Sequence, residues 1–352
     1  MTPPNTAAAE AARPASLPEG PFHYPHPGAA RDPFGRLVDY LRISVTDRCN
    51  ERCLYCMPEG YKGWAARPDH LRADEIVAIA TAAVARGFRK FRITGGEPLV
   101  RADIVDILAR IGRIPGVESL GLSTNATRLA PVARDLAAAR VRSINASLDA
   151  LDPARYRRIT GGDLAPVLAG IDAALDAGIE CVKLNCVLMR GINEDEYLPL
   201  IAYAGARGLP LRFIELMPLT RTDVLDQRNF LSVGELMRRL SVHGPLVPLP
   251  DYRPGHGPAS YYAFGTEGVR IGFIGALTTR HFCETCNKLR LTADGKLRPC
   301  LGRHGEIDLL GPLRAGTATV GALLDAAIAS KPENHEFTGC YQPRRPMTAI
   351  GG

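Results

Sequence analysis

Between residues 41 and 216 the sequence alternates short apolar runs with longer stretches of helical periodicity. The apolar runs are Leu41–Val45, Phe91–Thr94, Leu120–Thr124, Ile144–Leu148, Val182–Leu188 and Leu211–Leu216. Two helical stretches, Asp74–Arg86 and Leu164–Ala177, are each followed by a glycine that can end a helix. Strands that alternate with helices form a parallel sheet covered by helices. Six such units fall short of a closed eight-stranded barrel, so we expect an α/β fold with an open, partial, about six-stranded parallel βα barrel.

Most of the expected strands have one apolar and one polar face. In the first strand Leu41, Ile43 and Val45 share one face, and Arg42 and Ser44 share the other. The same division pairs Arg92 with Thr94, Ser123 with Asn125, Asn145 with Ser147, and Lys183 with Asn185. Because a buried charge without a partner is costly, we expect the polar faces to surround a polar, anionic ligand inside the barrel. The alternative is that these strands lie at edges, with their polar faces in solvent.

Nine cysteines occur in the chain, and six of them form two tight groups. The groups are Cys49-x3-Cys53-x2-Cys56 and Cys283-x2-Cys286-x13-Cys300. An odd number of cysteines in a long chain indicates metal or redox chemistry rather than a disulfide framework. Three thiolates can hold three irons of a four-iron cluster and leave the fourth iron open, although a zinc site remains an alternative for the first group. We interpret Cys181 and Cys186, which belong to neither group, as buried small apolar residues.

The C-terminal third departs from the alternating pattern. A capping box at Ser232 and Glu235 predicts a helix through Leu240. Two further strands, a hairpin turn and a last helix are expected at Tyr261–Phe264, Val269–Ile274, Asp294-Gly295 and Thr319–Ala329. We therefore expect four parts: a disordered Ala/Pro-rich extension (1–34), the partial barrel (35–220), a small iron–sulfur module (221–345) and a Gly-Gly tail (346–352).

The first cysteine group, with Tyr55 before its last cysteine, resembles the radical S-adenosylmethionine enzymes. The motif Gly95-Gly96-Glu97-Pro98 after the second strand agrees with this resemblance. Further motifs resemble the GTP 3′,8-cyclase family of molybdenum cofactor biosynthesis, and the resemblance covers residues 36 to 352. These motifs are Tyr40–Asp47, Arg92–Pro98, Ser123–Asn125, Ser147–Asp149, Arg212–Met217, the second cysteine group and the terminal Gly351-Gly352.

The resemblance implies two [4Fe–4S] clusters and S-adenosylmethionine as cofactors, and GTP as substrate. In the family, the first cluster reduces S-adenosylmethionine to release a 5′-deoxyadenosyl radical, which abstracts the 3′ hydrogen of GTP. The ribose carbon then attacks C8 of guanine and gives 3′,8-cyclo-7,8-dihydro-GTP. The second cluster binds the guanine end of the substrate. The resemblance also implies an electron donor of the flavodoxin or ferredoxin type and a downstream cyclic pyranopterin monophosphate synthase, and it is compatible with a homodimer.

The resemblance further assigns roles to single residues. The expected cluster ligands are Cys49, Cys53, Cys56, Cys283, Cys286 and Cys300. The expected contacts to S-adenosylmethionine are Tyr55, Gly96, Ser147 and Met217. The expected GTP contacts are Arg42, Arg92, Ser123, Lys183, Lys288, Leu289 and Arg290, and the expected catalytic residues are Arg212, Gly351 and Gly352. The family usually has arginine where this chain has Lys288, and lysine lacks the planar fork for a bidentate contact. We expect the Gly-Gly tail to enter the barrel mouth beside Arg212.

Charge and composition exclude several other classes. The net charge of +6 is mild and no block of lysine and arginine alone occurs, so a nucleic-acid partner is not expected. No uncharged apolar run of about 18 residues predicts a membrane span, so we expect a soluble, cytoplasmic enzyme. Two alternatives stay open: another radical enzyme with an auxiliary cluster, such as a peptide maturase, and a non-catalytic iron–sulfur or zinc protein.

Overall fold

The computed structural model describes residues 30–57, 70–220, 222, 228–337 and 341–351. Its centre is one 12-stranded sheet with the strand order β12-β11-β10-β1-β2-β3-β4-β5-β6-β9-β8-β7. The strands are β1 (Tyr40–Ser44), β2 (Lys90–Thr94), β3 (Ser119–Thr124), β4 (Ser143–Ser147), β5 (Cys181–Val187), β6 (Leu211–Ile214), β7 (Leu246–Pro248), β8 (Ser260–Phe264), β9 (Val269–Ile274), β10 (Lys288–Leu291), β11 (Lys296–Arg298) and β12 (Ile307–Asp308).

The expected open barrel is confirmed, and its parallel part is longer than six strands. Strands β1 to β6 run parallel in chain order, as the periodicity predicts. Two strands of the C-terminal third extend this parallel part, because β10 pairs with β1 and β9 pairs with β6. Residues of the expected C-terminal module (221–345) thus contribute strands to both edges of the same sheet. Antiparallel hairpins then complete each edge, β10-β11-β12 on one side and β9-β8-β7 on the other.

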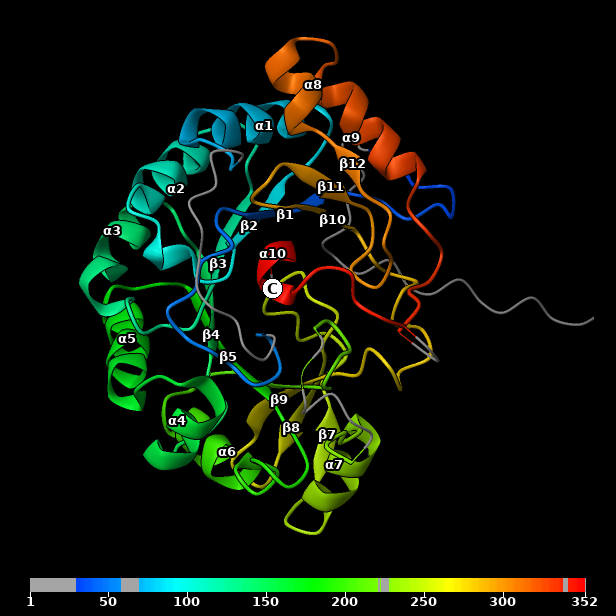
Figure 1. Cartoon of the computed structure of the whole chain (residues 1–352). Helices are drawn as coiled ribbons and strands as arrows, with labels where there is room; N and C mark the ends of the chain where they lie inside the picture. The colour runs from blue at the N-terminus through cyan, green and yellow to red at the C-terminus, as the bar shows by residue number, and fades with distance from the viewer. Residues whose placement is uncertain (1–29, 58–69, 221, 223–227, 338–340, 352) are drawn as a thin grey trace, which may run out of the picture.

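Helices cover the outer face of the curved sheet (Figure 1). They are α1 (Ala73–Ala85), α2 (Ile104–Gly112), α3 (Ala133–Ala138), α4 (Pro153–Thr160), α5 (Leu164–Asp176), α6 (Tyr197–Ala206), α7 (Val233–Ser241), α8 (Leu310–Ala315) and α9 (Val320–Ala329), with 3₁₀ turns at Pro98–Val100 and Ala130–Val132. A last short helix, α10 (Met347–Ile350), does not belong to this outer layer. The apolar faces of the strands supply the core beneath them: Leu41, Ile43, Phe91 and Ile93 are at most 1% exposed. Figure 1 shows α10 on the concave side, in the middle of the arc.

Local signals account for most element ends. The hydroxyls of Ser232 and Thr319 accept hydrogen bonds from the first turns of α7 and α9, as N-caps do. The expected reciprocal bond from Glu235 gives way to ion pairs with Arg190 and Arg239, because charged partners bind a carboxylate more strongly than a backbone amide. Gly295, with a φ of +73°, turns the chain between β10 and β11. None of the described helices is both long and apolar enough to cross a bilayer.

Candidate active site

The first cysteine group lies at the upper end of the barrel, where the parallel strands have their carboxyl ends. Cys49 follows β1, and the loop that carries the group is fixed to α4 by backbone hydrogen bonds, such as Leu54 N–H to the carbonyl of Ile159 at 2.9 Å. Burial raises the pKa values of Cys49 and Cys56 to about 12, so both thiols are protonated at neutral pH. Binding of a metal displaces these protons and gives the thiolate ligands. Among the described residues no three His, Cys, Asp or Glu side chains meet the geometry of a single metal ion.

The motif Gly95-Gly96-Glu97-Pro98 packs against this loop. The amides of Gly96 and Glu97 donate to the carbonyls of Thr46 and Arg48 at 2.8 and 2.7 Å. A Cβ at Gly96 would lie 2.4 Å from the carbonyl oxygen of Arg48. We expected glycine here to admit a ligand, but in this structure its small size admits the backbone that leads to the cysteines. The contact of Gly96 with S-adenosylmethionine stays a prediction.

The second cysteine group lies at the opposite, lower end of the barrel. Strand β10 runs parallel to β1 with Lys288 beside Tyr40, and Cys286 stands two residues before the start of β10. Strand β11 runs back antiparallel to β10, so Cys300, two residues after its end, also lies at the lower end. The two cysteine groups are therefore separated by the length of the barrel interior.

Basic side chains from five strands project into that interior. We call them the basic lining: Arg42 (β1), Arg92 (β2), Lys183 (β5), Arg212 (β6) and Arg290 (β10). Burial, followed by the neighbouring Arg290, lowers the pKa of Arg42 to about 9. Burial also lowers the pKa of Arg290 to about 10, and Arg298 acts in the same direction. Burial likewise lowers the pKa of Lys183 to about 8, to which Arg92 and Arg212 contribute. Several buried cations that lower one another's pKa values indicate a site for an anion.

Several buried polar atoms of the interior have no hydrogen-bond partner among the described residues. They include Nε and Nη2 of Arg212 and the Oδ1 atoms of Asn145 and Asn185. Arg212 is only 5% exposed, although it stands near the start of its strand. The same burial excludes strand edges in solvent: Arg92 is 6% exposed and Lys183 1%. Unpartnered donors and acceptors in one enclosed space fit a polar, negatively charged ligand.

The lining residues differ in how tightly the protein itself holds them. Arg92 donates to the Tyr40 hydroxyl, the Leu122 carbonyl and the Ser143 hydroxyl at 2.7 to 2.9 Å. Lys183 contacts the carbonyl of Pro254 and the thiol of Cys181, both at 2.9 Å. Arg92 is thus already fixed by three partners, whereas Lys183 can exchange its partners for a ligand oxygen more easily.

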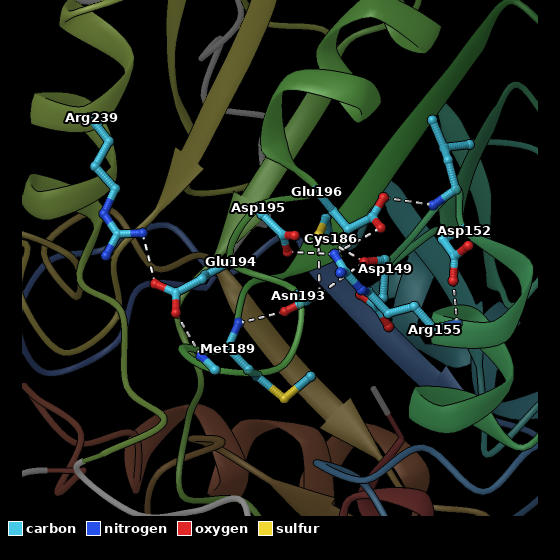
Figure 2. A network of polar contacts seen from close by, with 12 residues as sticks. Asp149, Asp152, Arg155, Cys186, Met189, Asn193, Glu194, Asp195, Glu196 and Arg239 are labelled. Carbon is cyan, nitrogen blue, oxygen red and sulfur yellow. Dashed lines mark hydrogen bonds and ion pairs between the residues drawn. The ribbon is translucent and has the colours of Figure 1, made fainter.

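The residues expected to contact S-adenosylmethionine lie near the upper end, after β1, β2, β4 and β6. The hydroxyl of Tyr55 donates to Asp149 Oδ2 at 2.7 Å, which ties the first cysteine loop to the end of β4. Asp149 Oδ1 accepts from the Val187 amide at 2.9 Å, and Asn193 donates to the Asp149 carbonyl at 2.8 Å. Figure 2 shows the part of this network around Asp149, Asn193 and Glu196, in which Glu196 accepts hydrogen bonds from the Leu151 amide and from Arg155 of α4. These contacts hold the segment that follows Ser147, the last residue of β4.

The three consecutive residues expected to contact guanine do not point the same way. Lys288 and Arg290 belong to the polar face of β10, with the Lys288 ammonium 5.5 Å from the centre of the Tyr40 ring. Leu289 is fully buried in the hydrophobic core, so only its backbone can face the interior. Ser123 lies on β3 with its hydroxyl 3.4 Å from Asn145 Nδ2.

The Gly-Gly tail reaches the barrel interior, but the observed contacts are not with Arg212. The carbonyl of Gly351 accepts from Arg290 at 3.1 Å, and a Cβ on Gly351 would lie 2.7 Å from Ser44 Cβ. The tail is tied to the first cysteine loop through Thr220, whose hydroxyl accepts from the Met347 amide and donates to the Cys56 carbonyl. Gly352 and Cys340 lie outside the described residues.

Sequence reasoning missed the segment Pro254–Gly257, which forms the floor of the barrel at its lower end. Besides the Pro254 carbonyl on Lys183, a Cβ on Gly257 would lie 3.6 Å from Arg212 Nη1. The His256 ring meets the Tyr40 ring edge-on at 6.1 Å. A loop without periodicity offers no signal for such a position. Of the other cysteines, Cys186 is buried in the core as expected, while Cys181 is half-buried and donates to Pro254.

The floor predicts a specific pH dependence of stability. Burial, followed by the nearby Lys90, lowers the pKa of His256 to about 4. In the unfolded chain this histidine has its ordinary pKa of about 6.5, so as pH falls below that value the unfolded state binds a proton that the folded state does not yet bind. The free energy of unfolding therefore decreases. His256→Gln should therefore remove about 2 kcal/mol of the loss between pH 7.5 and pH 5, measured by anaerobic urea unfolding. The exposed His243 provides the matched control, His243→Gln; equal losses in both variants would contradict the assignment.

Comparisons with known proteins agree with this geometry. Residues 43–204 match the Radical SAM superfamily, and residues 209–337 match the family Molybdenum Cofactor Synthesis C. The chain is 45% identical to the GTP 3′,8-cyclase of Pelotomaculum thermopropionicum, over 92% of this chain and 100% of that protein. It is 43% identical to the GTP 3′,8-cyclase of Moorella thermoacetica with the same coverage, and 43% identical to that of Rhodopseudomonas palustris, over 91% and 95%.

Solved structures resemble the chain in fold alone. Streptococcus suis SuiB bound to its precursor peptide SuiA superposes with a TM-score of 0.58 at 16% identity, over 79% of this chain and 65% of that chain. The enzyme anSMEcpe with bound AdoMet gives a TM-score of 0.53 at 15% identity, over 85% and 82%. The sequence similarity over nearly the whole length, together with the two matching family models, leads to one assignment: the chain belongs to the GTP 3′,8-cyclase family of the radical SAM superfamily.

Proposed function

We propose that this protein converts GTP to 3′,8-cyclo-7,8-dihydro-GTP in an early step of molybdenum cofactor biosynthesis. The observation that carries the proposal is the placement of two cysteine groups at opposite ends of one barrel, with the basic lining between them. A radical source at one end and a substrate anchor at the other suit a nucleotide that spans the interior. The similarity to curated cyclases over nearly their whole length supports the same conclusion.

The cysteine groups fit two [4Fe–4S] clusters, each with three protein ligands and one open iron. Cys49, Cys53 and Cys56 would hold the first cluster, which supplies the electron that cleaves S-adenosylmethionine. The chain's own task is to bind and orient. The basic lining neutralises the phosphate chain, and Arg212, with two unpartnered nitrogens, is placed to donate hydrogen bonds to substrate. The floor and α10 close the interior from below and above and so exclude water from it.

The remaining assignments rest on the resemblance. Tyr55, Gly96, Ser147 and Met217 contact S-adenosylmethionine, and the second cluster with Lys288 binds the guanine end. A small one-electron donor of the flavodoxin or ferredoxin type reduces the first cluster, and a cyclic pyranopterin monophosphate synthase takes up the product. The eight described cysteines are all free thiols, which suits a reducing compartment such as the cytoplasm.

A peptide maturase remains the second candidate, because the fold of SuiB is similar. One assay separates the two candidates: reconstituted enzyme is incubated with S-adenosylmethionine, dithionite and GTP, and the nucleotide products are identified by mass spectrometry. A product with the mass of GTP that hydrolyses to a cyclised pterin supports the proposal. Cleavage of S-adenosylmethionine without any change in GTP would exclude it, and absence of cleavage would favour a non-catalytic iron–sulfur protein.

Metal content is a separate prediction. Anaerobic reconstitution should load two four-iron clusters per chain, and Cys283→Ala should remove only the second, because the two groups occupy opposite ends of the barrel. Iron and sulfide analysis with Mössbauer spectroscopy measures this. Cys181→Ala is the matched control, since its thiol contacts only Pro254 and Lys183. Tightly bound zinc without sulfide would contradict the prediction.

A further inference from the structure

Lys331 is a buried lysine beside the second cysteine group. It follows α9 and is 3% exposed. Its ammonium lies 3.3 Å from Cys286 Sγ and 2.9 Å from each of two backbone carbonyls, those of Lys288 and Pro299. An ammonium group has three N–H bonds, so these three partners use its whole donor capacity.

None of these three partners is a carboxylate. Removing an ammonium ion from water is expensive unless an opposite charge compensates it. Of these three partners within the described residues, the sulfur of Cys286 is the one that can carry a negative charge. A Cys286 thiolate, the form that binds iron, would therefore compensate the cost of burying the Lys331 ammonium.

The three hydrogen bonds also connect the ligands to one another. Lys288 stands two residues after Cys286, and Pro299 directly precedes Cys300. One side chain thus binds the sulfur of one ligand and the backbone next to another. Lys331 itself stands two residues after α9, on a segment of the chain other than those that carry the cysteines.

We propose that Lys331 is the counter-ion of the second cluster, donating a hydrogen bond to the Cys286 thiolate and raising the reduction potential of the cluster. The inference rests on the second cluster of the proposed function. Three thiolates already outweigh the positive charge of the iron–sulfide core, and reduction adds one more electron. A neighbouring cation stabilises the reduced form more than the oxidised form, so it raises the potential.

The charged side chains around the two cysteine groups differ in a way that also favours a higher potential for the second cluster. Beside the second group, the Lys331 ammonium lies 3.3 Å from Cys286 Sγ, and Lys288 stands two residues after Cys286. At the first group the Cys53 thiol faces the carboxyl of Glu51, 4.0 Å from its sulfur. The chain thus places cations at the substrate end and carboxyl groups at the radical end. The second cluster should accordingly have the higher potential of the two.

The test compares Lys331→Met with the unchanged residue in the full-length, reconstituted chain. Both proteins carry Cys49→Ala, Cys53→Ala and Cys56→Ala, so that only the second cluster contributes signal. Iron analysis first verifies about four irons per chain. Redox titration followed by electron paramagnetic resonance then measures the midpoint potential. We expect the ratio of reduced to oxidised cluster at a fixed potential to fall at least about tenfold, which corresponds to about 59 mV.

Lys296→Met is the matched control, because it removes one lysine of the same sheet that pairs with Asp308 instead of sulfur; its potential should stay unchanged. An unchanged potential in Lys331→Met overturns the proposal. If Lys331→Met does not retain iron, Lys331→Arg and Lys331→Gln are compared instead. Recovery of iron content and midpoint potential in the arginine variant alone supports a counter-ion role. Equal iron content and potential in the two variants overturns the proposal. A parent protein without four irons contradicts the proposed function instead, since it lacks the second cluster itself.

Discussion

Deleting Gly351 and Gly352 should abolish formation of the cyclised nucleotide while both clusters and the cleavage of S-adenosylmethionine persist. The Gly351 carbonyl accepts a hydrogen bond from Arg290, and the tail reaches the first cysteine loop through Thr220. Removing the glycines releases Arg290 and opens the interior above the substrate. Because small misplacements of reacting groups cost about 100-fold in rate, we expect product formation to fall at least that much. Chromatography of nucleotide products measures the effect.

A single substitution tests whether the tail needs glycine at position 351 for its backbone conformation and close packing. Gly351 has a φ of +89° and no room for a Cβ, which would lie 2.7 Å from Ser44 Cβ. Gly351→Ala should therefore impair product formation in the same direction as the deletion. Gly316→Ala is the matched control, since Gly316 has a φ of +65° with open space around it. Near-normal product from the truncated chain would show that the tail is dispensable.

Lys183→Met should weaken GTP binding about 10- to 150-fold, the loss expected when a partly desolvated phosphate contact worth about 1.5–3 kcal/mol is removed. Lys183 is 1% exposed within the basic lining, and its present partners are one carbonyl and one thiol. Cleavage of S-adenosylmethionine should continue, because this chemistry belongs to the upper end of the barrel. Arg92→Met should act in the same direction, with an added loss of stability from its three abandoned partners.

Arg142→Met controls for the loss of one positive charge. Arg142 stands before β4, is exposed and pairs with Glu180 on the surface. Equilibrium dialysis with labelled GTP should give this variant the affinity of the unchanged protein. If Lys183→Met and Arg92→Met also retain that affinity, the lining is structural and the substrate lies elsewhere.

The half of the fold with strong local periodicity could be predicted from the sequence. Strands β1 to β5 begin within one residue of the predicted runs, because alternating apolar residues mark a sheet with one face in the core. The polar alternates, such as Arg42 and Lys183, identified the interior for the same reason. Capping residues such as Ser232 placed the helices.

The rest depended on contacts between distant parts of the chain. The pairing of β10 with β1 joins Lys288 to Tyr40, and no local pattern specifies such a partner. Strand β7 (Leu246–Pro248) is three residues long and ends in proline, so it carries no alternation to detect. Lys331 resembles an ordinary surface lysine after a helix until the fold places it against Cys286. Burial of single charges depends on the whole sheet, so sequence pattern alone could not predict it.

The pairing of the first strand with a strand near the end of the chain also has a consequence for biosynthesis. One edge of β1 has its partner in Lys288–Leu291, and at about 5–20 residues per second the ribosome adds those residues roughly 10–50 s after β1. During that interval the growing chain exposes an unpaired strand edge, which other chains can recruit. A stalled or truncated chain therefore threatens the cell with aggregation, and it also lacks the second cysteine group. The pairing of β1 with β10 and the competence to bind the second cluster thus both wait until synthesis of the polypeptide is nearly complete.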